Sequence, residues 1–299
     1  MSWSGVSEGR GDMGERFEME EISFKHLRGR TCVITGGGGV IGRVLAEGLA
    51  AVGIKVAILD IAASAATEVA GAIGADFGVD AIGVEADVLS VESMKTARSE
   101  VVSRLGEIDF LINGAGGNRP DATTKAEFAD GESDLNKTFF GLGISGFDRV
   151  FELNFKGTLI PTMVIAEDMV RRRRGAVLNI SSMNAFRPLT KIPAYSAAKA
   201  SINNFTEWLS VHLAKSNVRV NAIAPGFFVT KQNEFLLYDE KSGELSPRGR
   251  KIVDGTPMGR FGDVEELIGT TLYLLSDLSK FVTGAVIPVD GGFNAYSGV

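Results

Sequence analysis

The sequence predicts an α/β protein: a single Rossmann-fold domain with a doubly wound parallel sheet of about seven strands and helices on both faces. Short apolar runs with the length of buried strands alternate with longer segments of helical periodicity. A glycine-rich turn at residues 36–42 joins the first apolar run to the first helical segment, which is typical of phosphate-binding folds. No change in composition marks a domain boundary, so we expect residues 23–299 to form one domain.

Composition and charge restrict the kinds of partner. The hydrophobic fraction of 44% is ordinary for a soluble globular protein, and the net charge of −6 argues against nucleic-acid binding. No apolar run approaches the length of a membrane span, so we expect no membrane partner. One cysteine, Cys32, and two histidines allow no disulfide framework and leave little for a metal site. We therefore expect no metal and a reducing, cytoplasmic location.

The N-terminal part predicts a dinucleotide site. Residues 1–22 lack the pattern of a signal peptide and are expected to be a flexible extension. Thr31–Thr35 is a predicted buried strand, and the glycine-rich turn after it lets the backbone approach a pyrophosphate at a helix N-terminus. The next strand, Lys55–Leu59, leads to Asp60, whose carboxylate suits a ribose 2′-hydroxyl and repels a 2′-phosphate. We therefore expect NAD, with NADP as the alternative if Arg43 compensates the charge of Asp60.

Two further strands lead to the same edge of the predicted sheet. Ala81–Glu85 precedes Asp87, which is placed to contact the adenine. Phe110–Asn113 precedes a second glycine-rich turn at residues 114–117. A helix is expected at about 154–172, and four arginines at its end complement the helix dipole.

A proton-transfer site is predicted where the next strand meets a long helix. The apolar run 176–180 ends before Ser181 and Ser182, and a helix begins near Ala194. Tyr195 and Lys199 are four residues apart and share one face of this helix. A nearby ammonium should lower the tyrosine pKa from its usual value of about 10, while a serine holds the reacting oxygen. A lone pattern of this kind is more often an exposed helix surface, but the upstream serine and the glycine-rich turn favour catalysis.

The last part of the chain completes the sheet. A strand at 219–223 leads to a segment containing Pro225, Gly226 and Thr230, and a helix at 263–276 precedes a strand at 285–289. Two long loops remain, at 117–146 and 227–262. Because ligands bind beyond the carboxyl ends of parallel strands, these loops should form a substrate pocket and its lid.

From about Phe24 to its end, the chain resembles the short-chain dehydrogenase/reductase family. The resemblance implies that Asn154 holds a water in a proton relay, that Ser182, Tyr195 and Lys199 are catalytic, and that the lysine also holds the nicotinamide ribose. Two positions depart from the family pattern: Val40 replaces a glycine of the first turn, and Gly114 replaces the second asparagine of the motif NNAG. The implied cofactor-binding residues are Gly36, Gly38, Gly39, Val40, Ile41, Gly42, Asp60, Asp87, Val88, Asn113, Gly114, Ala115, Gly116, Tyr195, Lys199, Pro225, Gly226, Phe228 and Thr230.

Within this family, the chain is similar to the short-chain-type D-mannonate oxidoreductases, also called fructuronate reductases. The similar stretches include INGAGGNRPDATT, NISSMNAFRPLTKIPAYS and NAIAPGFFVTKQN, which cover the loops expected to touch substrate. The implied reaction is reversible hydride transfer between C5 of D-mannonate and NAD, giving D-fructuronate. A sugar acid needs a cation for its carboxylate, for which Arg187 or Arg119 is expected. The full set of expected substrate residues is Asn118, Arg119, Asn184, Arg187, Lys191, Gln232 and Asn233.

Other interpretations remain open at this stage. Another sugar-acid oxidoreductase, similar to gluconate 5-dehydrogenase, would need only small changes in the two loops. A non-catalytic NAD-binding regulator is disfavoured because the residues that resemble the catalytic set are all present. The resemblance also implies a homotetramer assembled through the helices near 154–172 and 194–214 and the C-terminal strand, although Phe205, Trp208 and Leu209 could equally belong to the core.

Overall fold

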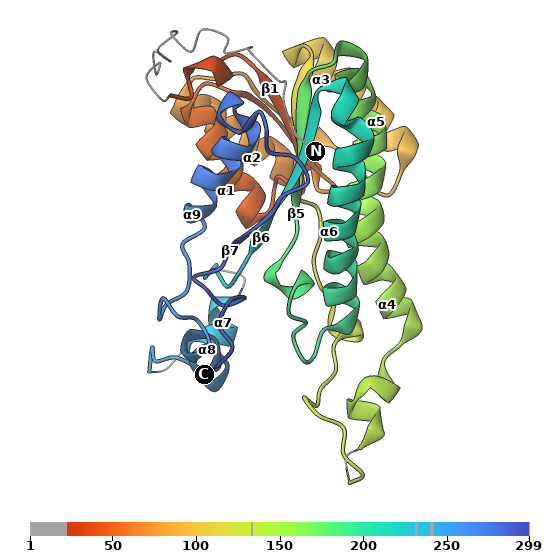
Figure 1. Ribbon diagram of the computed structural model, residues 1–299, viewed down its shortest axis with the longest axis vertical. Helices are drawn as coiled ribbons and strands as arrows, with labels where there is room; N and C mark the ends of the chain where they lie inside the picture. Colours follow the sequence, from red (N-terminus) through yellow and green to blue (C-terminus); the bar gives the residue numbers. More distant parts are fainter. Residues whose placement is uncertain (1–22, 133, 231–232, 240–241, 299) are drawn as a thin grey trace, which may run out of the picture.

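The chain folds around one parallel sheet of seven strands in the order β3-β2-β1-β4-β5-β6-β7 (Figure 1). The computed structural model describes residues 23–298 except 133, 231–232 and 240–241, so the predicted extension at 1–22 lies outside the described residues. The strands are β1 (Thr31–Thr35), β2 (Lys55–Asp60), β3 (Ala81–Glu85), β4 (Ile108–Asn113), β5 (Gly175–Ile180), β6 (Val218–Pro225) and β7 (Val286–Val289). The predicted fold class is confirmed.

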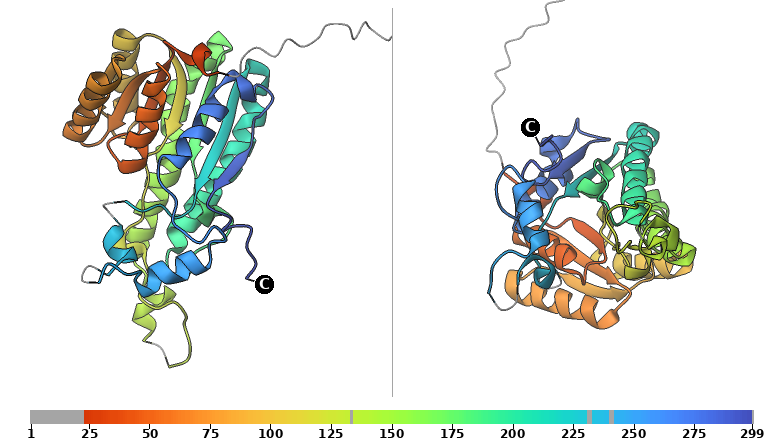
Figure 2. Two further views of the ribbon diagram at one scale, coloured as in Figure 1. Left: turned by 90° about the vertical axis from the view of Figure 1, so that its left-hand side faces the viewer. Right: turned by 90° about the horizontal axis from the view of Figure 1, so that it is seen from below.

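Helices cover both faces of this sheet, as two further views show (Figure 2). The connections after the first five strands are formed by α1 (Val40–Ala51), α2 (Ala63–Phe77), α3 (Val91–Leu105), α4 (Ile144–Phe151), α5 (Gly157–Arg172) and α6 (Pro193–Leu213). The later helices are α7 (Glu234–Leu237), α8 (Pro247–Asp254) and α9 (Glu266–Leu275). The helix predicted from residue 154 begins earlier, because a π-helical segment, Glu152–Lys156, joins α4 to α5.

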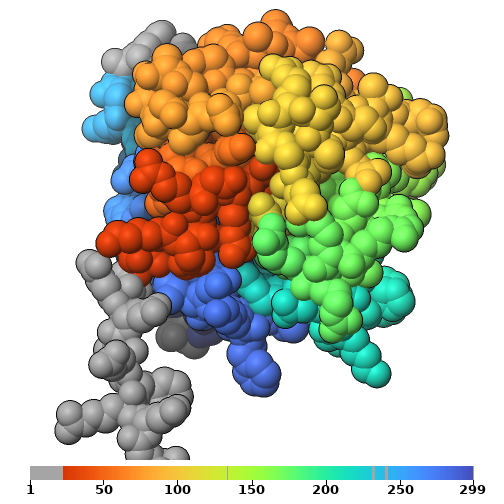
Figure 3. Space-filling model, turned by 90° about the horizontal axis from the view of Figure 1, so that it is seen from above, coloured from red at the N-terminus to blue at the C-terminus, as the bar shows by residue number. Residues whose placement is uncertain are grey.

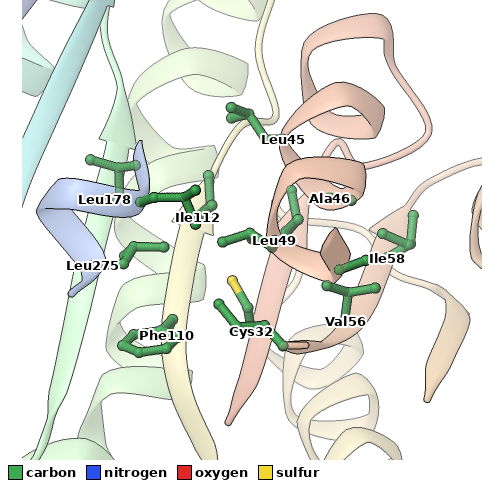
Figure 4. Packing of buried hydrophobic residues seen from close by; sticks show 14 of the residues in the cluster. Cys32, Leu45, Ala46, Leu49, Val56, Ile58, Phe110, Ile112, Leu178 and Leu275 are labelled. Carbon is green, nitrogen blue, oxygen red and sulfur yellow. The ribbon is translucent and has the colours of Figure 1, made fainter. Parts of the chain in front are cut away.

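Each central strand of the sheet contributes side chains to two separate hydrophobic cores, one on each face of the sheet. On one face, Cys32 and Ile112 pack with Leu45 and Leu49 of α1 and Leu275 of α9 (Figure 4). On the other face, the alternate residues of the same strands, such as Val33 and Leu111, pack against α3, α5 and α6. Burial on both faces explains why the strands appear in the sequence as continuous apolar runs rather than as alternating patterns.

The end of the molecule where the strands begin is closed by the segment before β1 (Figure 3). Leu27 is fully buried in the first core, and the amide of Gly29 donates to the carbonyl of Gly53 at 2.8 Å. This segment therefore belongs to the folded unit.

The two stretches predicted as loops lie beyond the opposite end of the sheet and contain short helices (Figure 1). The first holds the 3-10 turns Pro120–Ala122, Leu135–Lys137 and Phe139–Gly141 before α4. The second holds α7 and α8, and Ser246 caps α8 by accepting a hydrogen bond from the amide of Gly249 at 3.0 Å. A Ser-Pro pair often marks the first residues of a helix. Here the pair lies in a polar stretch that is equally typical of a loop, so α8 was not predicted.

Candidate active site

The glycine-rich turn between β1 and α1 is tight enough to require several of its glycines. Gly36 has φ of +64°, and a Cβ placed on it would lie 2.8 Å from the Cα of Ala115. A Cβ on Gly42 would lie 2.5 Å from the carbonyl oxygen of Gly36. Val40 is the first residue of α1, where helical backbone accommodates a side chain. The departure from the family glycine at this position therefore leaves the turn intact.

The end of β2 places a carboxylate beside this turn. Asp60 Oδ2 accepts a hydrogen bond from the amide of Gly38 at 3.1 Å, and its Oδ1 accepts one from the amide of Ala62 at 3.0 Å. Arg43 does not compensate this charge, because its Nε pairs with Oε1 of Glu47 at 2.9 Å. The first helical turn of α1 and the carboxylate of Asp60 thus form one end of a pocket, which suits a dinucleotide with a free 2′-hydroxyl.

Ser182, Tyr195 and Lys199 converge at the centre of the same pocket. Ser182 follows the end of β5, and its hydroxyl is close enough to that of Tyr195 to lower the tyrosine pKa. Lys199 Nζ donates to the carbonyl oxygen of Ile180 at 2.7 Å and lies 5.5 Å from the centre of the Tyr195 ring. The strand end and the helix face identified in the sequence therefore meet in space.

The pKa of Tyr195 differs from the expected direction. Burial raises the pKa of this phenol, and the hydrogen bond with Ser182 opposes the increase only in part. Burial also lowers the pKa of Lys199 from 10.5 to about 8. In the protein alone, the expected lowering of the tyrosine pKa by Lys199 is not found: loss of solvent raises this pKa, and the opposing contribution comes from Ser182.

Asn154 lies behind the pocket wall and is fully buried. Its Nδ2 donates to the carbonyl oxygens of Gly117 and Val150 at 2.7 and 2.8 Å, and its Oδ1 accepts from the amide of Gly117 at 3.2 Å. A Cβ on Gly116 would lie 2.6 Å from this Oδ1 and 3.4 Å from Lys199 Nζ. The π-helical segment that carries Asn154 therefore fixes the second glycine-rich turn against the lysine, a backbone detail that sequence periodicity does not predict.

The pocket has a volume of about 560 Å³ and contains most of the expected cofactor residues. Four of those residues do not line it. Gly38 supports the turn through Asp60, Asp87 accepts from the amide of Leu89 at 2.9 Å, and Asn113 donates to Thr162 and Asn179 inside the protein. Val88 is buried. The expected residues that line the pocket are Gly36, Gly39, Val40, Ile41, Gly42, Asp60, Gly114, Ala115, Gly116, Ser182, Tyr195, Lys199, Pro225, Gly226, Phe228, Thr230 and Asn233.

Of the expected substrate residues, Asn233 alone among those described lines the pocket. Its side chain also holds the preceding segment, donating to the carbonyl of Phe228 at 2.9 Å and accepting from the amide of Thr230 at 2.8 Å. The two arginines expected to bind the substrate carboxylate have other partners. Arg119 pairs with Asp121 at 3.1 Å, and Arg187 donates to the carbonyl of Tyr296 at 2.6 Å. The structure also leaves Asn118, Asn184 and Lys191 outside the pocket lining, and Gln232 lies outside the described residues.

The structure adds pocket residues that sequence reasoning missed. They form a wall on α7, α8 and the segment before them, here called the α7–α8 wall: Phe227, Leu236, Leu237, Arg248 and Ile252. All five lie in the stretch 227–262, which was expected to contribute to the substrate pocket, but the sequence did not indicate which of its residues face inward.

The described residues contain neither a metal-binding cluster nor a membrane-spanning helix. Within the part of the chain that the structure describes, His, Cys, Asp and Glu form no group of three or more that could hold a metal ion. Over the same residues, no helix combines the length and the apolar character needed to span a membrane.

Comparisons with known proteins agree with this geometry. Residues 38–294 match a short-chain dehydrogenase/reductase family model described as enoyl-(acyl carrier protein) reductase. An uncharacterised oxidoreductase of Bacillus subtilis is 49% identical over 276 residues, covering 92% of this chain and 98% of the relative. The 5-keto-D-gluconate 5-reductase of Escherichia coli is 32% identical over 267 residues, covering 89% and 96%.

A solved structure is also similar throughout. A Haemophilus protein crystallised with bound NAD, and provisionally described as a D-mannonate oxidoreductase, has a TM-score of 0.88 and 48% identity, covering 92% of this chain and 99% of that one. The family match extends over most of the chain and includes every residue that lines the pocket except Gly36. The chain therefore belongs to the short-chain dehydrogenase/reductase family, as an oxidoreductase that acts on an alcohol group with a nicotinamide cofactor.

Proposed function

We propose that the protein interconverts D-mannonate and D-fructuronate with NAD, and that Tyr195 is the general acid and base. The observation that carries the chemistry is the convergence of Ser182, Tyr195 and Lys199 in the pocket that also contains the glycine-rich turn. The substrate rests on the similarity to the Haemophilus protein. NAD is favoured over NADP because Asp60 faces the pocket as a carboxylate that Arg43 leaves uncompensated.

Different residues of the pocket would perform different parts of the alcohol oxidation. Bound NAD would accept the hydride from C5, and NADH would supply it in the reverse direction. Tyr195 takes the hydroxyl proton during oxidation and returns it to the carbonyl oxygen during reduction. Ser182, which lines the pocket beside Tyr195, holds the same oxygen so that the proton travels a short distance.

Lys199 and Asn154 support this proton transfer. With a pKa of about 8, Lys199 is mostly protonated at neutral pH, and its charge favours the phenolate form of Tyr195 when that form is needed. We assign Lys199 also to the nicotinamide ribose, and Asn154 to positioning the turn at Gly117 and a relay water beside it.

A second candidate substrate is a 5-keto-D-gluconate-like sugar acid. The Escherichia coli reductase of that name supports it at 32% identity. The two candidates share the carboxylate and the reacting C5 oxygen and differ in the hydroxyl configuration, so the same catalytic residues serve either one.

The deciding experiment follows absorbance of reduced nicotinamide with NAD or NADP and a panel of D-mannonate, D-gluconate, D-altronate and neutral polyols. We expect NAD reduction with D-mannonate, and a loss of about 10²- to 10⁴-fold in kcat for Tyr195→Phe, since a positioned acid–base group contributes that much. Tyr273→Phe on α9 removes a hydroxyl outside the pocket and is the matched control. Turnover confined to D-gluconate would move the substrate to the second candidate, and full activity of Tyr195→Phe would refute the mechanism.

We also propose that the protein assembles as a homotetramer through α5 and α6. Trp208 is 58% exposed and stacks between Phe205 and His212, and Met163 and Val211 are exposed on the same pair of helices, whereas Leu209 belongs to the core. Large exposed apolar side chains on these two helices favour a protein partner. Light scattering gives the molar mass, and a monomer at micromolar concentration would contradict the assembly.

A further inference from the structure

Arg248 introduces a positive charge into the α7–α8 wall of the pocket. The other charged side chains that line the pocket are Asp60, hydrogen-bonded beside the glycine-rich turn, and Lys199, hydrogen-bonded to Ile180. The side chain of Arg248 makes no ion pair or hydrogen bond with any residue that the structure describes. Its guanidinium is therefore available to a ligand.

The surroundings of Arg248 fix where its helix begins. The amide and hydroxyl of Ser246 donate to the carbonyls of Leu237 and Leu236, respectively, at 2.8 and 2.7 Å. A Cβ on Gly249 would lie only 2.2 Å from the carbonyl oxygen of Leu237. Because residues on both sides of Arg248 are held against α7, its backbone is well positioned in the wall.

Four other cations on this side of the molecule are already engaged. Lys251 Nζ lies 3.2 Å from Oε2 of Glu127, and Arg260 forms two hydrogen bonds with Glu266 at 2.7 and 2.8 Å. Arg119 and Arg187 are engaged with Asp121 and with the carbonyl of Tyr296. Arg250 on the same helix is also unpaired among the described residues, but only Arg248 of the two lines the pocket, so a substrate anion beside Tyr195 meets Arg248.

We infer that Arg248 binds the carboxylate of the sugar-acid substrate and thereby selects acids over neutral polyols. A guanidinium presents two parallel N–H donors to a carboxylate and stays charged at every pH of interest. The carboxylate end of the substrate would lie against the α7–α8 wall while its C5 hydroxyl meets Ser182 and Tyr195. This inference rests on the proposed function, because it assumes a carboxylate in the substrate.

The test compares Arg248→Gln and Arg248→Lys with Arg250→Gln, a control on the same helix whose side chain lies outside the pocket. For each variant, KM and kcat are measured for D-mannonate and for its uncharged amide, and NAD binding is measured without substrate. We expect Arg248→Gln to raise KM for D-mannonate by roughly 10- to 100-fold, as loss of a charge-assisted hydrogen bond predicts. KM for the amide, kcat and NAD binding should change much less. Arg248→Lys should fall between, because it keeps the charge and loses the planar fork.

The outcomes separate this inference from the proposed function. If the wild type oxidises D-mannonate and Arg248→Gln behaves like Arg250→Gln, Arg248 does not bind the carboxylate and the proposed function stands. An equal increase in KM for acid and amide, or loss of NAD binding, would also refute the carboxylate role. If the wild type oxidises neutral polyols and no sugar acid, the proposed function fails and this inference fails with it.

Discussion

Lys199 shows how strongly one buried side chain depends on its surroundings. It is 4% exposed, and its hydrogen bond to the carbonyl of Ile180 replaces only part of its hydration. A pKa near 8 places its titration close to neutral pH. The cation proposed to assist proton transfer is therefore one whose burial costs folding free energy, as is common for functional groups in active sites.

The cost of burying Lys199 predicts a pH dependence of stability. Between pH 8 and 10 the unfolded chain keeps this proton and the folded protein loses it, so the free energy of unfolding should rise with pH. With folded and ordinary pKa values of about 8 and 10.5, the rise is about 2 kcal/mol across this range. Denaturant unfolding of the wild type and of Lys199→Met measures it, because the methionine variant lacks this contribution. Parallel stability curves for the two proteins would contradict the predicted titration.

At the scale of elements, the contact between α1 and α9 depends on one glycine. A Cβ on Gly48 would lie 2.6 and 2.8 Å from the Cγ2 and Cγ1 atoms of Ile268. These atoms branch from the isoleucine Cβ and have little freedom to move away. Gly48 therefore sets how closely α1 approaches α9 over the first core.

This contact predicts opposite effects for two similar substitutions. Gly48→Ala should lower the free energy of unfolding by about 1–3 kcal/mol, because the overpacking outweighs the better helix propensity of alanine. Gly269→Ala, in α9, meets nothing within 4 Å and should raise it by about 0.5–1 kcal/mol. Thermal or denaturant unfolding measures both changes. Stabilisation by Gly48→Ala would show that the helices can separate freely.

For the whole molecule, the sheet joins two cores that lie on its opposite faces. Leu111 and Ile112 are neighbours in β4 and both are fully buried, one in each core. The pocket lies at the carboxyl ends of the central strands, so both cores support the position of its residues.

Equal burial predicts that Leu111→Ala and Ile112→Ala are both severely destabilising. Each should lower the free energy of unfolding by about 2–5 kcal/mol, because each leaves a cavity in a closely packed core. A sheet covered on one face only would tolerate one of the two changes. Chemical denaturation of both variants distinguishes these cases, and a loss below about 1 kcal/mol for either would contradict the two-core arrangement.

Local sequence patterns were sufficient to predict the sheet, the helices that cover it and the pairing of Ser182 with Tyr195, but not the short helices α4, α7 and α8. Strands Thr31–Thr35 and Ala81–Glu85 were predicted with their observed bounds. The first is buried along its whole length, as a continuous apolar run predicts, whereas the second lies at the sheet edge and is only partly buried. Ser182 and Tyr195 were brought together correctly because a strand end and the next helix start are close in any such fold.

The other features of the site depend on tertiary contacts and could not be predicted from local sequence patterns. The placement of Arg248 in the pocket, the engagement of Arg187 by Tyr296 and the π-helical segment around Asn154 depend on contacts between residues far apart in the chain. The raised pKa of Tyr195 likewise depends on how much solvent the folded chain excludes. Local patterns specify where an element forms and which face is apolar, whereas side-chain partners and solvation are fixed only when distant elements pack together.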